Sequence, residues 1–382
     1  MNAKKMLTSK SMCVIPWTGF ILEPNGRVKN CVCATDKLGN VNHDSIQDIL
    51  HGDVNRGIKQ NMLDEIKSDN CETCHRAEKD VSSFQNVVSS RLYYLKELKT
   101  VPLELYNDID NFQLSTADLR WRNTCDFACI YCNELYSSRW AAELGTSFTI
   151  ENQSRRDTKQ YILDNVGTLK NIYLAGGEPL LLKENIEVLD ALYAVNPDAM
   201  VRVNTNLNQL QGEVYNRICR FKNVHWTVSV ESQGAQFDYI RYGGSWLRFL
   251  ENLNQLRKLN HKITFNMLYF VLNHMSIFDC VDFFKAQGFG DNSFVLWTLT
   301  GPAYYDARHL PEHCLEEARQ ELERRMESAE YLIKHSYKIV YDHLQRPFEK
   351  NINSTLEELA RLDQRRNLDS KTIFPEFYAL IG

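Results

Sequence analysis

The chain has 382 residues, of which 43% are hydrophobic and 24% charged, and its formal net charge is −5 at pH 7. This composition is that of an ordinary globular protein, long enough for one large domain and a smaller one, or for two or three modest domains. The acidic charge argues against a broad basic surface that holds duplex DNA. The densest apolar run, residues 265–272, is too short to span a membrane.

Residues 1–12 lack the apolar segment of a signal peptide. We therefore expect a cytoplasmic protein without a membrane partner. In that compartment, eleven cysteines serve as metal ligands more often than they form disulfides.

A β-hairpin is predicted near the N-terminus, because Asn25-Gly26 lies between the β-prone runs 18–23 and 27–31. Cys31 and Cys33 are two residues apart on the returning strand and share a face. Short helices are predicted over 45–50 and 55–67, ahead of a Cys-x-x-Cys pair formed by Cys71 and Cys74. With Cys13, five cysteines can converge here. Four complete a closed iron–sulfur cluster and one is spare, but a four-cysteine zinc site has much the same pattern.

A second group of cysteines lies in the middle of the chain, where Cys125, Cys129 and Cys132 fall within eight residues. Thiolates are the ligands of iron–sulfur clusters, and three of them leave one iron of a four-iron cluster free to bind a small molecule. A zinc site normally needs a fourth Cys or His nearby, whereas the residues that follow are Asn-Glu-Leu. The spacing favours the open cluster over zinc.

Strands and helices alternate regularly between residues 111 and 305. Strands are predicted over 114–121, 171–174, 200–203, 225–230, 263–271 and 293–299, and helices over 137–144, 157–166, 183–195, 209–220, 246–259 and 277–287. This order predicts an α/β fold with a parallel sheet and right-handed crossovers, in the form of an open or closed barrel. The cysteine loop follows the first of these strands, and later strands end in Gly-Gly-Glu-Pro, Asn-Thr-Asn and Val-Glu-Ser. Such barrels carry their chemistry at these strand ends.

One of these motifs is Gly176-Gly177-Glu178-Pro179. Its glycines allow a close approach of backbone to a ligand, and Glu178 is available for an ammonium group. The same motif is also typical of a plain strand-to-helix turn.

Ser229 and Arg241 are candidates to bind a carboxylate or a ribose, although a lone arginine is usually a solvated charge. Tyr131 is a candidate either to pack on a ring or to lie in the core.

The C-terminal region, residues 306–382, predicts a long helix that begins at Pro311 and carries an apolar stripe as far as Ile333. A further helix is predicted over 356–362, before an aromatic tail at 374–381. We expect this region to close the open side of the barrel or to cover the substrate.

The spacing Cys125-x3-Cys129-x2-Cys132, with an aromatic before the last cysteine and Gly-Gly-Glu-Pro after the next strand, resembles the radical S-adenosylmethionine (SAM) superfamily. The segment from Cys13 through Pro24-Asn25-Gly26 and Cys31 to Cys71-x2-Cys74, with Glu78, resembles the SPASM/twitch auxiliary-cluster module. Ser-Ser-Arg-Trp at 137–140 is similar to the twitch subgroup, in which the module precedes the barrel. SPASM modules usually follow the barrel, so this order is a departure. It leaves open whether Cys31 or Cys33 is a ligand, and the position after the turn favours Cys31.

The resemblance implies a partial (β/α)6 TIM-like barrel over 111–305, a twitch/SPASM-like module over 1–85 and a helical extension over 306–382. It implies a [4Fe-4S] cluster whose open iron is chelated by SAM, and a second, auxiliary [4Fe-4S] cluster. The ligands it implies are Cys125, Cys129 and Cys132 for the first cluster and Cys13, Cys31, Cys71 and Cys74 for the second.

The resemblance also implies which residues contact SAM. Gly176, Gly177 and Glu178 are expected to hold the amino group, Ser229 to lie near the ribose and carboxylate, Arg241 to bind the carboxylate, and Leu296 and Tyr131 to lie near the adenine. An electron donor such as flavodoxin or ferredoxin is the implied partner.

Three functions remain open at this point. The first is a radical SAM enzyme that abstracts hydrogen from an amino-acyl carbon of a peptide. The second is an isomerase or modifying enzyme that acts on a glycyl- or amino-acyl-modified thymidine in phage DNA, in the host cytoplasm. The third is a non-catalytic iron–sulfur or zinc scaffold. The acidic charge favours a peptide, and a base in duplex DNA would have to be flipped out. The absence of a recognisable leader-peptide-binding domain favours the nucleoside.

Overall fold

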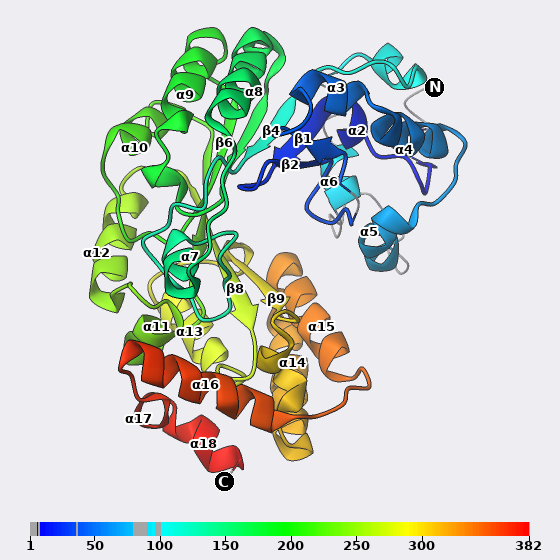
Figure 1. The fold of residues 1–382 in the computed structure, drawn as a ribbon. Coiled ribbons are helices and arrows are strands. Elements are labelled where there is room, and N and C mark those ends of the chain that lie inside the picture. Colours follow the sequence, from blue (N-terminus) through cyan, green and yellow to red (C-terminus); the bar gives the residue numbers. More distant parts are fainter. Residues whose placement is uncertain (1–5, 7, 36, 79–89, 96–100, 382) are drawn as a thin grey trace. The chain divides into compact units, whose positions relative to one another are not determined.

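The computed structural model describes the chain except residues 1–5, 7, 36, 79–89, 96–100 and 382 (Figure 1). The chain forms two compact units. The first comprises residues 1–125, 134–203 and 211–224, and the second comprises residues 126–133, 204–210 and 225–382. None of the helices in the described part of the chain is long and apolar enough to cross a membrane.

The first unit is built on a sheet in the order β3-β2-β1-β4-β5-β6. The strands are β1 (Gly19–Leu22), β2 (Arg27–Lys29), β3 (Gly39–Asn40), β4 (Thr116–Leu119), β5 (Asn171–Leu174) and β6 (Met200–Thr205). The predicted hairpin is formed by β1 and β2, and Gly26 adopts the positive φ of +84° at its turn. Strand β1 then pairs in parallel with β4, so the N-terminal hairpin extends the sheet of parallel strands.

The first unit also contains several of the helices labelled in Figure 1. They are α2 (Ile15–Thr18), α3 (Ile46–His51), α4 (Asp53–Leu63), α5 (Glu72–Ala77), α6 (Ser90–Leu95), α7 (Ser138–Leu144), α8 (Asn152–Asp164), α9 (Glu184–Val195) and α10 (Glu213–Ile218). The core includes Trp17 and Trp121, both fully buried. The indole of Trp121 donates to Asn185 of α9 at 3.0 Å, which ties the segment before the cysteine loop to a helix.

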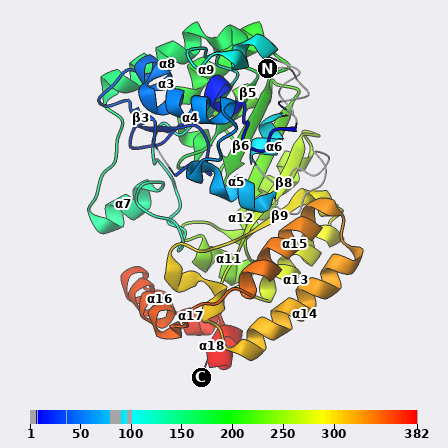
Figure 2. The same ribbon diagram turned by 90° about the vertical axis from the view of Figure 1, so that its right-hand side faces the viewer.

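The second unit contains the parallel strands β7 (Val224–Ser229), β8 (Lys262–Tyr269) and β9 (Phe294–Thr298). Its helices are α11 (Gly234–Ile240), α12 (Trp246–Arg257), α13 (Ser276–Ala286), α14 (Glu312–Ser328), α15 (Tyr331–Leu344), α16 (Ile352–Arg366), α17 (Ser370–Ile373) and α18 (Pro375–Ile381). Figure 2 shows α14 and α15 running alongside one another after β9.

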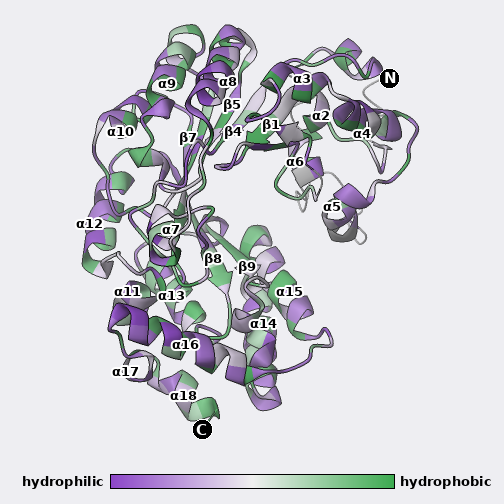
Figure 3. Ribbon diagram, viewed as in Figure 1, coloured by the Kyte–Doolittle hydropathy of each residue, from purple (hydrophilic) through white to green (hydrophobic). Residues whose placement is uncertain are grey.

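The two faces of β7–β9 differ in character. Phe265 of β8 stacks on Phe284 of α13, with ring centroids 4.3 Å apart, and on its register partner Phe294 at 5.5 Å. This face therefore packs against the helices, and it makes β8 and β9 mainly hydrophobic in Figure 3. The opposite face carries Ser229 in register with Asn266.

The predicted fold class, an α/β partial barrel with parallel strands, is confirmed by the strand order and the parallel pairing within each unit. The single long helix expected from Pro311 is instead two, α14 and α15. The break comes at Ala329 and Glu330, where the backbone amide of Glu330 donates to Asp291 at 2.9 Å. The apolar stripe continues across the break, so periodicity alone does not reveal it.

Candidate functional site

The first cysteine of the loop is fixed by the serines that follow it. The backbone amide of Cys125 donates to Oγ of Ser138 at 3.1 Å, and that hydroxyl donates to the Cys125 carbonyl at 3.2 Å. Ser137 caps α7 by accepting from the amide of Trp140. The side chain of Asn123 donates to the carbonyl of Glu134 at 2.8 Å, which joins the two ends of the loop. The Ser-Ser-Arg-Trp segment thus holds Cys125 in place.

The Gly-Gly-Glu-Pro motif packs directly against the segment that leads into Cys125. The amide of Gly177 donates to the carbonyl of Arg122 at 3.2 Å, and that of Glu178 donates to Thr124 at 2.8 Å. A Cβ at Gly177 would lie 2.1 Å from the Thr124 oxygen, so only glycine permits this approach. Gly176 has a positive φ of +114°. The carboxylate of Glu178 is buried and accepts from the amide of Leu180 at 3.3 Å.

The rest of the cysteine loop belongs to the second unit. The amides of Ala128 and Ile130 donate to the carbonyls of Tyr242 and Ile240, at 2.8 and 2.9 Å. The loop is therefore bonded along its backbone to the end of α11. The amide of Cys132 donates to the carbonyl of Cys129 at 2.9 Å, which makes a tight turn between these two cysteines.

The side chain of Asp126 also holds the cysteine loop through hydrogen bonds. Its two carboxylate oxygens accept from the side chains of Asn206 and Asn208, each at 2.7 Å. Leu207 between them is fully buried and has a positive φ of 60°, a strained conformation for a branched residue. Asn252 holds this turn by donating to the carbonyls of Leu207 and Asn208.

Arg241 lies against the loop as a buried cation. Its Nε and Nη2 donate to the two oxygens of Glu231, both at 2.7 Å, and its Nη1 lies 3.9 Å from Sγ of Cys129. The guanidinium also lies 6.0 Å from the ring centroid of Tyr131. Burial raises the pKa of Cys129, while the neighbouring Arg241 opposes that rise.

The remaining predicted residues are placed as follows. Tyr131 packs edge-on against Phe270, with centroids 6.0 Å apart. Ser229 lies on the face of β7 opposite the buried Val228. Leu296 is fully buried and shares its face of β9 with Phe294, so it points toward the helices. The residue beside it on the other face is Trp297, which is 48% exposed. The adenine contact assigned to Leu296 gains no support from this position.

The N-terminal cysteines lie together in the first unit. Hydrogen bonds with Cys33, followed by burial, raise the pKa values of Cys31 and Cys74. Burial raises the pKa of Cys13 to about 12, although the amide of Ile15 donates to its sulfur and opposes the rise. The amide of Arg91 donates to Cys74 in the same way. Cys33 contacts both Cys31 and Cys74, so the preference for Cys31 over Cys33 stays a prediction.

These thiols fit iron–sulfur chemistry. Donors directed at sulfur, such as the amides of Ile15 and Arg91 and Nη1 of Arg241, stabilise thiolate ligands and tune clusters. In the described ranges, no three His, Cys, Asp or Glu side chains are grouped around a point as ligands of one metal ion. The cysteines of a cluster each bind a different iron, so they need not be grouped around one point.

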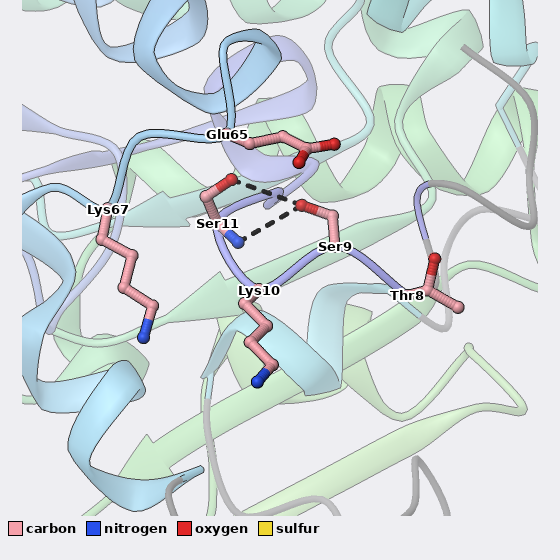
Figure 4. Close-up of a pocket in the computed structure, with 6 residues that line it drawn as sticks. All are labelled: Thr8, Ser9, Lys10, Ser11, Glu65 and Lys67. Carbon is pink, nitrogen blue, oxygen red and sulfur yellow. Dashed lines mark hydrogen bonds between the residues drawn. The ribbon is translucent and has the colours of Figure 1, made fainter.

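A cavity of about 390 Å³ lies elsewhere in the first unit (Figure 4). It is lined by Thr8, Ser9, Lys10, Ser11, Glu65 and Lys67. Oγ of Ser9 accepts from the amides of Ser11 and Met12, at 3.3 and 3.1 Å, which shapes the turn before Cys13. None of the lining residues is a cysteine.

The spacing of the cysteines and glycines alone marks them as candidates in the sequence, and their roles stay predictions. Sequence reasoning gave no role to Asp126, and it named Ser138 and Glu231 only as members of motifs and not as the residues that hold the loop and the arginine. The signal was present for Glu231, since it follows strand β7 and lies ten residues before Arg241. Asp126 carries no pattern of its own that marks a contact with Asn206 and Asn208.

Two parts of the chain match known families. Residues 121–284 match the radical SAM superfamily, and residues 13–75 match the SPASM iron–sulfur cluster-binding domain. No curated protein matches the chain.

Several solved structures are similar to this one. They include anSMEcpe with bound AdoMet (14% identity, TM-score 0.43, covering 56% of this chain and 60% of that one). Streptococcus suis SuiB bound to precursor peptide SuiA is another (13%, TM-score 0.41, 80% and 69%). TYW1 with a lysine-pyruvate adduct is a third (13%, TM-score 0.30, 55% and 71%). The match thus spans about 60% of the length of anSMEcpe.

Proposed function

We propose that this radical SAM enzyme, which carries a SPASM-type iron–sulfur domain, abstracts a hydrogen atom from an amino-acyl carbon of a peptide. Its two domains identify its cofactors as a [4Fe-4S] cluster with SAM and an auxiliary iron–sulfur cluster. The observation that carries the proposal is the cysteine loop itself. It holds three thiolates inside the matched radical SAM segment and leaves the fourth ligand position to SAM.

A [4Fe-4S] cluster held by Cys125, Cys129 and Cys132 would supply, together with SAM, the one-electron chemistry needed to remove a hydrogen atom from an unactivated carbon. The protein itself holds and orients the cluster and SAM. Cys125, Cys129 and Cys132 are the proposed ligands, and Gly177 brings the Gly-Gly-Glu-Pro segment against the entry to the loop. We propose that the backbone near Gly176 and Glu178 binds the SAM amino group.

Arg241 is proposed to bind the SAM carboxylate. Glu231 accepts from Nε and Nη2, so the two-point contact is proposed for the other edge, formed by Nη1, whose second hydrogen can still point to Cys129, and the second hydrogen of Nη2. Ser229, on the face of β7 away from the helices, is proposed to lie near the ribose. Tyr131 and Leu296 are proposed near the adenine on the resemblance alone.

The auxiliary cluster is proposed to sit on Cys13, Cys31, Cys71 and Cys74, with Cys33 spare. We propose three functional parts, which are the auxiliary module over 1–85, the barrel over 111–305 and the helical extension over 306–382. A flavodoxin- or ferredoxin-like protein is the proposed electron donor.

The peptide is proposed as substrate because SPASM-type proteins commonly act on peptides and because the chain is acidic, with a net charge of −5. Negative charge disfavours the phosphate backbone that a DNA substrate would bring.

The experiment uses deuterium transfer. The reconstituted protein is incubated anaerobically with SAM, a reductant and a peptide pool from cells grown on α-deuterated amino acids. The deuterium content of the 5′-deoxyadenosine product is then measured by mass spectrometry. We expect deuterium in the 5′-deoxyadenosine. Transfer only from deuterated thymidine derivatives, supplied in a parallel reaction, would favour the nucleoside instead. If protein with a full complement of clusters does not cleave SAM, the proposed enzyme function is wrong and the chain is a non-catalytic iron–sulfur scaffold.

A further inference from the structure

We propose that Glu231 is a positioning residue that holds Arg241 against Cys129 and thereby sets the reduction potential of the cluster in the barrel. The proposal rests on the proposed function, because it concerns the cluster bound by the cysteine loop. Glu231 itself touches neither cofactor nor substrate, and it acts both by fixing Arg241 and through the charge of its own buried carboxylate.

The geometry of the pair leaves Arg241 little freedom. Both oxygens of Glu231 accept from the guanidinium at 2.7 Å, and the two side chains are 1% and 4% exposed. A two-point contact of this kind fixes the plane of the guanidinium as well as its distance. That plane directs Nη1 toward Sγ of Cys129, 3.9 Å away.

Glu231 is anchored independently of Arg241. The side chain of Asn273 donates to its carbonyl at 3.0 Å and to that of Leu268 at 2.8 Å, which fixes the chain just beyond β7. The hydroxyl of Tyr131 also reaches its carboxylate. The Glu231 carboxylate therefore contacts Tyr131, two residues after Cys129, and also Arg241, which faces the sulfur of Cys129.

Two effects on the cluster follow. A donor directed at a ligand sulfur and a positive charge nearby both favour the reduced, more negative cluster, whereas the buried carboxylate opposes reduction. In the pair these charges compensate one another. Removal of either partner should therefore move the reduction potential, and the two removals should move it in opposite directions.

The test is a potentiometric titration followed by electron paramagnetic resonance. It uses protein with Cys71→Ala and Cys74→Ala, so that the barrel cluster alone is titrated. Glu231→Gln keeps the shape but leaves the Arg241 cation uncompensated, and Arg241→Met leaves the Glu231 anion. We expect the midpoint potential to rise in Glu231→Gln and to fall in Arg241→Met. Each change should alter the ratio of reduced to oxidised cluster at a fixed potential by about tenfold or more.

Asp306→Asn is the matched control, because Asp306 is a buried carboxylate that pairs with Arg308 and His343 rather than with the cysteine loop. Its midpoint should equal that of the parent. Glu231→Asp keeps the negative charge beside Arg241, so its midpoint should lie much closer to that of the parent than the midpoint of Glu231→Gln does.

Unchanged midpoints in both variants, or shifts in the same direction, would overturn the inference and leave the pair a structural one. A parent protein whose cysteine loop binds no cluster would overturn the proposed function instead. Iron content and circular dichroism of each variant separate these results from failure to fold.

Discussion

At the scale of single residues, the candidate site depends on close contacts that other side chains could not make. Gly177 is the clearest case, because the Thr124 carbonyl occupies the position that a Cβ would take. Arg241 is another, since its guanidinium is hydrogen-bonded to Glu231 and lies beside the sulfur of Cys129. Both residues stand out in the sequence, but their close neighbours do not.

Gly177→Ala should destabilise the protein by about 3 kcal/mol or more, because overpacking against a backbone atom forces the chain to move. Chemical denaturation measures the loss. Gly290→Ala is the control, since no atom lies within 4 Å of its Cβ position and its φ is −81°. Equal stability of the two variants would show that the Gly177 segment shifts freely.

Arg241→Lys should weaken SAM binding roughly ten- to a hundredfold, because an ammonium cannot make the two-point contact of a guanidinium and a lost charge-assisted hydrogen bond costs about 1.5–3 kcal/mol. Iron content should not change. Isothermal titration under anaerobic conditions gives the affinity. Arg324→Lys on α14, where the side chain is 66% exposed, should bind SAM as the parent does. An affinity within about twofold of the parent for Arg241→Lys would place the carboxylate elsewhere.

At the scale of elements, the sequence predicted most of the structure. The hairpin, the three strands of the second unit and helices such as α9 and α12 were predicted within a few residues, because periodicity and turn residues agree there. Helices α6 and α11 were missed. Both are short and lie between stronger signals. The parallel pairing of β1 with β4 was also missed, because the two strands are about a hundred residues apart and local patterns carry no information on such pairing.

Strand β9 offers a matched pair of neighbours. Leu296 is fully buried on the helix-facing side and Trp297 is 48% exposed on the other. Leu296→Ala should therefore cost about 2–5 kcal/mol of stability through the cavity it leaves, while Trp297→Ala should cost far less. Denaturation curves of the two variants give the comparison. A SAM affinity of the folded Leu296→Ala protein well below that of the parent would restore the predicted adenine contact.

Helix α4 carries a buried lysine. Nζ of Lys59 donates to the carbonyls of Ile109 and Asn111 at 2.9 and 2.7 Å, and burial lowers its pKa from 10.5 to about 8. Between these values the unfolded chain binds the proton that the folded chain has lost, so stability rises with pH across this range.

Lys59→Met should abolish that rise. The measurement is the difference in unfolding free energy between parent and variant at pH 7.5 and at pH 10, which removes the contributions of cysteines and tyrosines common to both proteins. We expect the variant to gain less stability with pH than the parent. Equal slopes would mean that Lys59 titrates normally.

At the scale of the whole molecule, we expect two clusters with different tasks. The predicted division into an auxiliary module, a barrel and a helical extension follows motifs, whereas the packing units mix these segments. Motifs that lie far apart in sequence are brought together by folding, so their grouping in the chain does not predict the packing units. The roles of the N-terminal cysteines and of the cysteine loop are therefore best tested by measuring iron content and turnover in the same variants.

The most direct test of the central claim is the anaerobic cleavage of SAM to 5′-deoxyadenosine by three proteins. These are the parent, a variant with Cys125, Cys129 and Cys132 changed to alanine, and a variant with Cys71 and Cys74 changed to alanine. The parent should hold about eight irons per chain and each variant about four. We predict cleavage by the parent, none by the first variant and some cleavage without product by the second. Cleavage by the first variant at the rate of the parent would contradict the assignment of the cysteine loop as the SAM-binding cluster site.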